Sequence, residues 1–507
     1  MLNNKLKYLW IILTLSLILV LLTIFIAAMI IKIGPSNFID KCLELLESKR
    51  ETWVILVAGS KGWYNYRHQA DVAHAYQILL NNGLRTDHII VMMTDDVAYD
   101  IENPFPGQLF NSPTGSNVHQ GLRVDYNGED VNSDNFLHVL TGNKIAMQNI
   151  GSGRVIESKE RDNIFVNFVG HGSSGILAFP KDYLYADELN ITLNSMYKSG
   201  KFHRMLLYVE ACKAGSLFDG ILSESSNIFA VTAAGPRESS WSIYCSGDDD
   251  NETSIICLGD EFSVTWIEDQ DNVKIGVFYP GQVNEFFETR TVLNHFNHVR
   301  NLVKLSNVMP YGDFNVGQDK LSSYIGKPSG VFSTNFNHYN TQSSTKNNNT
   351  NEKEKNLKNS TKLYQLSKNR IGVNNTMNKR KQYSENNKIM KNIMDQIFDA
   401  ILQGVIKRWP GFIGNINELK KLPRNLPLNV FPCYRRNLDL INENCFSLPK
   451  NLYALNAIHI FFNLCTRVID SNEWTQVQFD VTFNEVVLNV CSKNSTFSNL
   501  LKMTNIY

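Results

Sequence analysis

Short apolar runs separated by helical stretches recur through the first two thirds of the chain, and this alternation constrains the fold more than any other feature. The runs are Trp53–Ala58, His88–Met93, Ile164–Val169, Met205–Val209 and Ile228–Thr232. Continuous apolar runs bounded by polar or small residues are typical of parallel strands buried on both faces. Ala70–Asn82 has helical character and stops before Gly83, a helix C-terminal signal. We therefore expect an α/β domain over residues 53–330, with a mostly parallel sheet flanked by helices.

A change of composition marks the end of this domain. Residues 331–390 are rich in Asn, Lys, Ser and Thr, and 12 Asn fall between Thr341 and Met390. Such a segment cannot bury enough apolar surface to offset its chain entropy, so we predict a flexible linker. The chain as a whole has 507 residues, 43% of them hydrophobic, and a formal net charge of zero, which gives no indication of nucleic-acid binding.

The remaining residues, 391–507, are expected to form a small, mostly helical domain. Ile393, Ile397 and Ile401 lie on one helical stripe, and Leu452–Cys465 and Phe479–Val490 also have helical character. The domain holds four cysteines, for which two disulfides with three possible pairings are expected. Zinc binding is the alternative, but no Cys-x-x-Cys pair supports it, so no metal or other cofactor is predicted.

An uncharged N-terminal segment indicates the compartment. Residues 8–31 form a run of 24 residues, about 36 Å long as a helix, and Lys5 and Lys7 precede it. Residues 1–33 are either a retained signal anchor, which would make the membrane a partner, or a long signal peptide cut near Ala27. A short segment, 34–52, follows. Either alternative sends the chain into the secretory pathway. Six glycosylation triplets fit this location: Asn190, Asn251, Asn348, Asn359, Asn374 and Asn494.

Two residues that follow neighbouring strands carry the candidate chemistry. His171 comes after Ile164–Val169, and Cys212 comes after Met205–Val209. Working residues of parallel sheets lie just past the carboxyl ends of strands, so the two side chains are expected to meet. An imidazole beside a thiol suits a cysteine protease, and Gly172 leaves room for a substrate carbonyl. A structural histidine with a buried cysteine remains an equal alternative on these residues alone.

Longer motifs resemble one family. The matching stretches are Val57–Ser60, Gly62–Asp71, Val91–Met93, Gly128–Val131, His171–Gly175, Glu210–Cys212, Pro236–Ser240 and Phe462–Cys465. The chain resembles the legumains, asparaginyl endopeptidases of the caspase-like clan of cysteine proteases, from about Trp53 to Glu268. The resemblance returns in the four-cysteine spacing. It implies a caspase-like peptidase domain, a lysosomal or vacuolar location, protein substrates with Asn at P1 (the residue before the cleaved bond), and cleavage after Asp at lower pH.

The resemblance also implies roles for individual residues. Cys212 would be the nucleophile, His171 the proton carrier and Asn65 the residue that orients the histidine. The N–H groups of Gly172 and Cys212 would form the oxyanion hole. The pocket for the substrate asparagine would consist of Arg67, His68, Glu210, Ser239, Ser240 and Asp260. Such a pocket offers a hydrogen-bond donor beside acceptors, as a carboxamide requires.

Further expectations follow from the resemblance outside the site. Cys433 would pair with Cys465 and Cys445 with Cys491. The cysteines Cys42, Cys245 and Cys257 are then left free or buried, without a role. The 391–507 domain would act as an inhibitory prodomain, removed in acid by self-cleavage at an Asn between Asn335 and Asn387. Cystatin-type inhibitors are also implied as partners.

Two positions depart from the family pattern. Legumains commonly carry Asp before the catalytic histidine and Glu after the catalytic cysteine, whereas this chain has Gly170 and Lys213. These departures are expected to affect the pH optimum, the preference beyond P1 and any ligase activity. A transamidase or peptide ligase of the same clan, and a catalytically silent homologue, remain the alternative functions.

Overall fold

The computed structural model describes two compact units. They are Met1–Glu51 and Thr52–Tyr507. The described residues are 14–16, 18–21, 23, 50–245, 256–274, 289–327, 359, 361–362, 374–409, 416–421, 426–451, 453–469 and 473–493. Within these ranges, no helix is long and apolar enough to cross a membrane. Most of the predicted N-terminal apolar segment, 8–31, lies outside the described residues.

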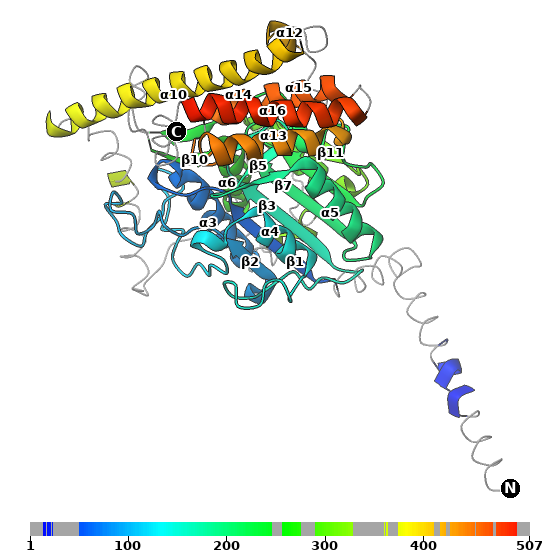
Figure 1. Ribbon diagram of the computed structural model, residues 1–507. Helices are drawn as coiled ribbons and strands as arrows, with labels where there is room; N and C mark the ends of the chain where they lie inside the picture. Colours follow the sequence, from blue (N-terminus) through cyan, green and yellow to red (C-terminus); the bar gives the residue numbers. More distant parts are fainter. Residues whose placement is uncertain are drawn as a thin grey trace. The chain divides into compact units, whose positions relative to one another are not determined.

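A six-stranded sheet forms the centre of the second unit, as the alternating pattern predicts (Figure 1). The strand order is β11-β8-β7-β3-β1-β2, with β11 antiparallel to β8 and the other pairs parallel. All five predicted apolar runs are strands of this sheet. Their bounds, with that of the added edge strand, are β1 Thr52–Ala58, β2 Ile89–Met92, β3 Asn163–Val169, β7 Arg204–Glu210, β8 Ile228–Thr232 and β11 Met309–Gly312.

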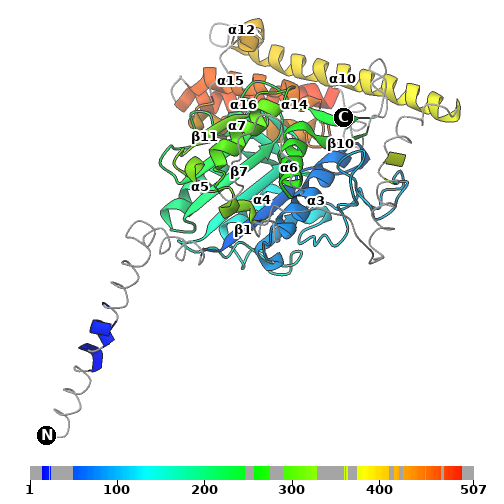
Figure 2. The same cartoon turned by 180° about the vertical axis from the view of Figure 1, so that it is seen from behind.

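Helices cover both faces of the sheet because successive strand residues point to opposite sides. Val54 and Leu56 belong to one core with α3, α6, α7 and α8, while Ile55 and Val57 belong to the other with α4 and α5. Figures 1 and 2 show these helices from the two sides. Their bounds are α3 Tyr66–Asn81, α4 Ser133–Thr141, α5 Ala186–Lys198, α6 Glu261–Lys274, α7 Val292–Leu302 and α8 Ser322–Ile325.

Two small sheets and several 3-10 turns lie outside the central sheet. The smaller strands are β4 Gly172–Ser173, β5 Ile176–Ala178 and β6 Tyr183–Tyr185 in one sheet, and β9 Ser242–Cys245 and β10 Cys257–Asp260 in the other. The 3-10 helices are η1 Trp63–Asn65, η2 Thr86–His88, η3 Gly128–Asp130, η4 Ala214–Leu217, η5 Val316–Gln318 and η7 Leu428–Val430.

The C-terminal region is helical, as expected. Its helices are α10 Asn374–Arg408, α12 Ile416–Lys421, α13 Phe431–Asn444, α14 Ala454–Ala457, α15 His459–Ile469 and α16 Glu473–Lys493. Disulfides join Cys433 to Cys465 and Cys445 to Cys491, the pairing that the family resemblance implies.

The predicted linker is too long at its C-terminal end. Most of residues 331–390 lie outside the described residues, but α10 begins at Asn374 instead of after Met390. The buried positions of the helix that the structure describes begin at Met390 and continue through Met394 and Ile397. Extending a helix from a packed segment costs far less than starting one, so α10 continues into a polar sequence that would not form a helix alone.

Candidate active site

Three strand ends bring the predicted catalytic residues together. His171 lies two residues after β3, and Cys212 lies two residues after β7, its neighbour in the sheet. Asn65 is the last residue of η1, in the connection from β1 to α3. Because β1, β3 and β7 run parallel, their carboxyl ends share one edge of the sheet. The three predicted residues therefore lie at the same edge of the sheet.

Asn65 fixes the orientation of the histidine. The Asn65 amide nitrogen donates to the Lys61 carbonyl at 2.8 Å, so its Oδ1 faces Nε2 of His171, 2.7 Å away. This oxygen can only accept a hydrogen bond, which places the imidazole proton on Nε2 and leaves Nδ1 as the basic nitrogen. Burial, helped by the charge of Arg67, lowers the pKa of His171 to about 3, so the ring is neutral above that pH.

Cys212 lies at a tight turn between β7 and η4. Lys213, directly after it, has a φ of 56°, a conformation that residues other than glycine seldom adopt. A Cβ on Gly172 would lie 2.6 Å from the Cys212 carbonyl oxygen, so glycine is needed where β4 passes the nucleophile. The Cys212 thiol is partly exposed and lies 3.7 Å from the Ser240 carbonyl oxygen. It is the one unpaired cysteine among the described residues.

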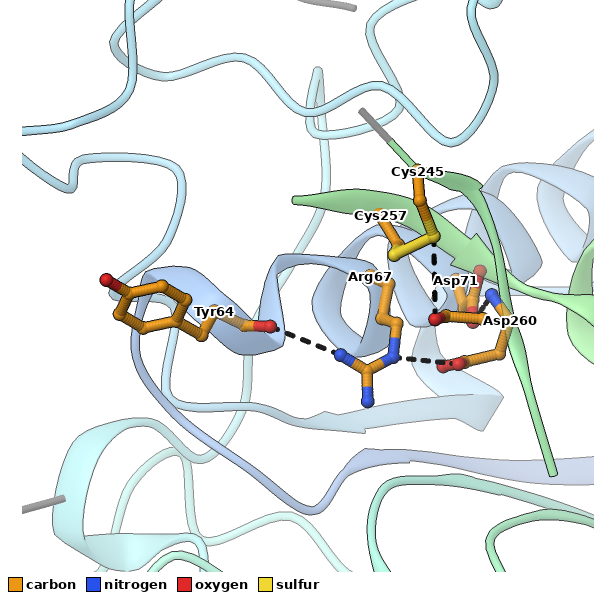
Figure 3. The surroundings of a disulfide bond; sticks show 7 residues. Tyr64, Arg67, Asp71, Cys245, Cys257 and Asp260 are labelled. Atoms are coloured by element: carbon orange, nitrogen blue, oxygen red, sulfur yellow. Dashed lines mark hydrogen bonds and ion pairs between the residues drawn. A yellow bond between two sulfur atoms is a disulfide. The ribbon is translucent and has the colours of Figure 1, made fainter. Parts of the chain in front are cut away.

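A charged pair forms one wall of the predicted specificity pocket (Figure 3). Arg67 Nε donates to Asp260 Oδ1 at 2.8 Å, and Arg67 Nη1 donates to the Tyr64 carbonyl at 3.2 Å. His68 Nε2 lies 3.5 Å from Asp260 Oδ2. Asp71 accepts from the Asp260 backbone N–H at 3.1 Å. Burial raises the pKa of both Asp71 and Asp260, while Arg67 opposes the increase at Asp260.

Glu210, which the family resemblance assigns to the same pocket, is almost fully buried. Its Oε2 accepts from the backbone N–H and the hydroxyl of Ser263, at 3.0 and 3.2 Å. Its Oε1 has no hydrogen-bond partner. Burial raises the pKa of Glu210 to about 8, and the charge of Asp260 adds to the shift. A buried acceptor without a partner in a pocket indicates a binding position for a donor group.

The other predicted pocket residues lie on the approach to β9. Ser239 and Ser240 are partly buried, and the Ser240 hydroxyl lies 4.0 Å from the Cys212 sulfur. Contacts thus link Arg67 and His68 to Asp260, and Ser240 to Cys212. Among the described residues, no group of three or more His, Cys, Asp or Glu side chains is arranged to hold a metal ion.

Sequence reasoning missed several supporting residues. Ser263 holds Glu210, and Ser60 bonds to His68 through a 2.6 Å contact. Asn111 donates to Asp71 at 2.6 Å and so holds the carboxylate that supports Asp260. Asp71 lies in a stretch that matches the family, yet nothing in the sequence ties it to a residue 189 positions away.

The prediction that Cys245 and Cys257 are free or buried without a role is wrong, because they form a disulfide. They are directly opposite in the antiparallel pair β9–β10. β9 has only four residues, too few to stand out as a strand, so the sequence did not reveal their juxtaposition. Cys42 lies outside the described residues.

The C-terminal region extends to the catalytic residues. One pocket is lined by Ser60, Lys61, Asn65 and His171 together with Pro449 and Lys450. The Ser173 hydroxyl, beside Gly172 on β4, donates to the Leu455 carbonyl. A Cβ on Gly175 would lie 2.8 Å from the Phe431 ring.

Comparisons with known proteins assign the chain to a family. Residues 52–327 match the model of the peptidase C13 family. The chain belongs to the peptidase C13 family. It is 41% identical to human legumain over 274 residues, 54% of this chain and 59% of that protein. It is 41% identical over 278 residues to a vacuolar-processing enzyme from Citrus sinensis, covering 54% of each. The matches span less than two thirds of these relatives' length.

A solved structure also aligns with the chain. Caspase-1 from Spodoptera frugiperda shares 12% identity over 55% of this chain and 93% of that one, with a TM-score of 0.30. This similarity is too low to support an argument. The C13 assignment and the six-stranded sheet with its flanking helices identify the fold.

Proposed function

We propose that this C13 peptidase is an endopeptidase that hydrolyses peptide bonds after asparagine, and after aspartate at lower pH. The observation that carries the proposal is the arrangement of Cys212 and the Asn65–His171 pair beside a pocket of opposed charges. The names of the relatives, legumain and vacuolar-processing enzyme, support a protein-processing role in a lysosome- or vacuole-like compartment.

The mechanism follows from the tautomer of His171. Nδ1 takes the Cys212 proton, and the thiolate attacks the carbonyl carbon after P1. The N–H groups of Gly172 and Cys212 would stabilise the oxyanion that forms. His171 then returns the proton to the departing amine, leaving an acyl-enzyme, and activates the water that hydrolyses it. Asn65 keeps the ring in the tautomer that this sequence requires.

The pocket suits a carboxamide. Arg67 can donate to the carboxamide oxygen, and the amide hydrogens can reach the acceptors on Glu210 Oε1 and Asp260 Oδ2, both buried without a hydrogen-bond partner. An apolar P1 side chain would leave these acceptors unsatisfied, at a cost of about 1–3 kcal/mol each. An ionised aspartate would face two carboxyl groups, and it becomes acceptable when acid protonates it.

The helical C-terminal region is the proposed inhibitor of the same site. Its Pro449 and Lys450 line the pocket that contains His171. Its Leu455 carbonyl accepts from the hydroxyl of Ser173, which follows Gly172 on β4. An ion-pair cluster, here called the latch, joins it to the α/β domain. In this cluster Arg435 donates to Asp187 at 2.8 and 2.9 Å and pairs with Glu188 at 2.9 Å. Acid would weaken this latch by protonating Glu188, because burial raises the pKa of that carboxyl group. Self-cleavage between Asn335 and Asn387 would then free the site.

The test is cleavage of a peptide with Asn at P1, from pH 4 to 7.5, after acid incubation. Wild type should cleave it in acid, and neither Cys212→Ala nor a peptide with Gln at P1 should give product. Mass spectrometry should find new C-termini at Asn residues between 335 and 387 in wild type alone.

The outcomes separate the alternatives. Processed protein that joins peptides without hydrolysing them would identify a ligase. Processed protein that does neither would identify a silent homologue, with Gly170 and Lys213 as the first positions to revert.

A further inference from the structure

The Cys245–Cys257 disulfide lies in a strand pair separate from the central sheet. β9 and β10 pair only with each other, and two-stranded ribbons of this size are marginal without further support. The bond joins Cys245, the last residue of β9, to Cys257, the first residue of β10. It therefore closes the ribbon at one end.

The opposite end of the ribbon forms two walls of the pocket. Asp260, the last residue of β10, pairs in register with Ser242, the first residue of β9. Asp260 holds Arg67. Ser242 lies two residues after Ser240, whose carbonyl oxygen is 3.7 Å from the Cys212 sulfur. Figure 3 shows the disulfide with Arg67 and Asp260 around it, and the Ser242 hydroxyl lies 3.6 Å from the Cys245 sulfur. The ribbon thus connects the Asp260 wall to the Ser240 wall.

The two strands are held unequally. β10 is buried along its whole length, and a Cβ on Gly259 would lie 2.3 Å from Val264 and 2.9 Å from Asp71. β9 is only half-buried. Its Tyr244 has a φ of 56°, a strained conformation for an aromatic residue. Opening the disulfide should therefore release β9 and leave β10 in place.

Among the described residues, hydrogen bonds also attach Tyr244 and Trp241 to α6. The Tyr244 hydroxyl donates to Glu268 Oε1 on α6 at 2.9 Å, and the Trp241 carbonyl accepts from the Glu261 N–H at 2.8 Å. Neither crosses the ribbon at its Cys245 end. Only the disulfide is a covalent link there, so it sets how firmly Ser240 is held against the Arg67–Asp260 side.

We propose that Cys245 and Cys257 are positioning residues for the specificity pocket, and that thiol reductants loosen the pocket by opening their disulfide. In the opening reaction one thiolate of a dithiol attacks a sulfur of the bond, and its second thiol displaces the mixed disulfide. Two electrons pass to the protein, both cysteines become thiols, and the dithiol becomes a cyclic disulfide. Cys212 must itself be reduced for activity, whereas the Cys245–Cys257 disulfide must stay oxidised. Full activity should therefore require a redox potential between those of the two reactions.

The proposal rests on the proposed function, and kinetics test it. Processed wild type is assayed in mixtures of reduced and oxidised dithiothreitol, with alkylation and mass spectrometry reporting the state of Cys245 and Cys257. When these two cysteines become reduced, KM for a P1 Asn peptide should rise about fivefold or more, with kcat changed less than about twofold. Cys245→Ala/Cys257→Ala should show the raised KM at every ratio.

Control variants separate the effect of the disulfide (the clamp formed by Cys245 and Cys257) from other effects. Tyr244→Phe removes the bond to α6 but keeps the disulfide, so it should retain the response to dithiothreitol. An unchanged KM in wild type whose Cys245 and Cys257 are shown to be alkylated would overturn the proposal, even if the double variant fails to fold. A response in the double variant would do the same.

Hydrogen exchange distinguishes failure of the clamp from failure of the proposed function. Exchange in β9 should accelerate on reduction while β10 stays protected, whether or not the protein cleaves peptides. Oxidised, processed wild type that cleaves no Asn peptide would refute the proposed function, and unaltered exchange in β9 would refute the clamp.

Discussion

Two arginines in this molecule bind carboxylates, and their surroundings differ. Arg67 pairs with Asp260 in a buried position, where side-chain exposure is 18% and 6%. Arg435 pairs with Asp187 and Glu188 at 31%, 13% and 33% exposure, and its guanidinium carbon lies 4.6 Å from the centre of the Tyr185 ring. The first pair lies within the α/β domain, while the second joins that domain to the C-terminal helices.

The two pairs differ in whether the carboxylates beside the arginine have hydrogen-bond partners. Beside Arg67, Glu210 Oε1 and Asp260 Oδ2 are buried without a hydrogen bond, although His68 Nε2 lies 3.5 Å from Asp260 Oδ2. Both carboxylates beside Arg435 are engaged directly, and solvent is near. A buried pair beside unsatisfied acceptors is suited to recognition, whereas a partly exposed pair stacked on an aromatic ring is suited to reversible attachment.

Removing Arg67 should have the largest effect. Arg67→Gln leaves Asp260 buried without its cation, so we expect about 3 kcal/mol of lost stability and a fall of about 100-fold in kcat/KM for P1 Asn. Thermal melting and steady-state kinetics measure the two effects. Arg85→Gln is the control, because Arg85 and Asp87 form an exposed pair. Equal behaviour of the two variants would contradict the assignment of Arg67 to the pocket.

Removing Arg435 should have an intermediate effect on a different quantity. Arg435→Gln is expected to weaken retention of the cleaved C-terminal region about 10-fold, from loss of a half-exposed ion pair and its stacking on Tyr185. Size-exclusion chromatography between pH 4 and 7 measures retention after cleavage, and the variant should release the region at higher pH.

Arg436, the residue after Arg435, provides the matched control. Arg436 pairs with Asp480 on α16, so both partners belong to the C-terminal region. Arg436→Gln should therefore leave release unchanged. If both variants release alike, the latch is not at Arg435.

Short-range sequence patterns predicted the strands and several of the candidate site residues. The apolar runs identified the strands, and strand-end positions placed His171 and Cys212 at one edge of the sheet. The family motifs supplied Arg67, Glu210 and Asp260, which the structure gathers in one pocket. These residues lie on separate elements, and their spacing alone does not show that they meet.

Contacts between distant or weakly patterned elements were not predictable. Arg435 and Asp187 are 248 positions apart, and no local pattern marks either as a partner. Cys245 and Cys257 are only 12 apart, but β9, with four residues, is too short for its sequence pattern to identify a strand. Asn190 fits a glycosylation triplet, yet its side chain is buried in α5, where it contacts Asn194. A sequence motif reports composition, and burial decides access.

The smallest effect concerns the charge of Glu210. Its pKa rises from 4.5 to about 8 on folding, so the folded protein holds a proton that the unfolded chain releases between these values. The resulting stability is fully present below pH 4.5 and is lost as pH rises through 8. Glu210→Gln cannot ionise, so its melting temperature should fall less between pH 7 and 9 than that of the parent.

Cys212→Ala as the common background prevents self-cleavage during these melts. At pH 5 the glutamic acid is already neutral, and glutamine can accept the same two bonds from Ser263. Glu210→Gln with Cys212 intact places an NH2 group where the substrate amide needs an acceptor, so P1 Asn cleavage at pH 5 should fall about 10-fold. Parallel melting curves from pH 7 to 9 would show that Glu210 is ionised in the folded protein. The pocket would then select asparagine with a charged carboxylate at its base, making the Arg67 region more like the Arg435 latch than the structure indicates.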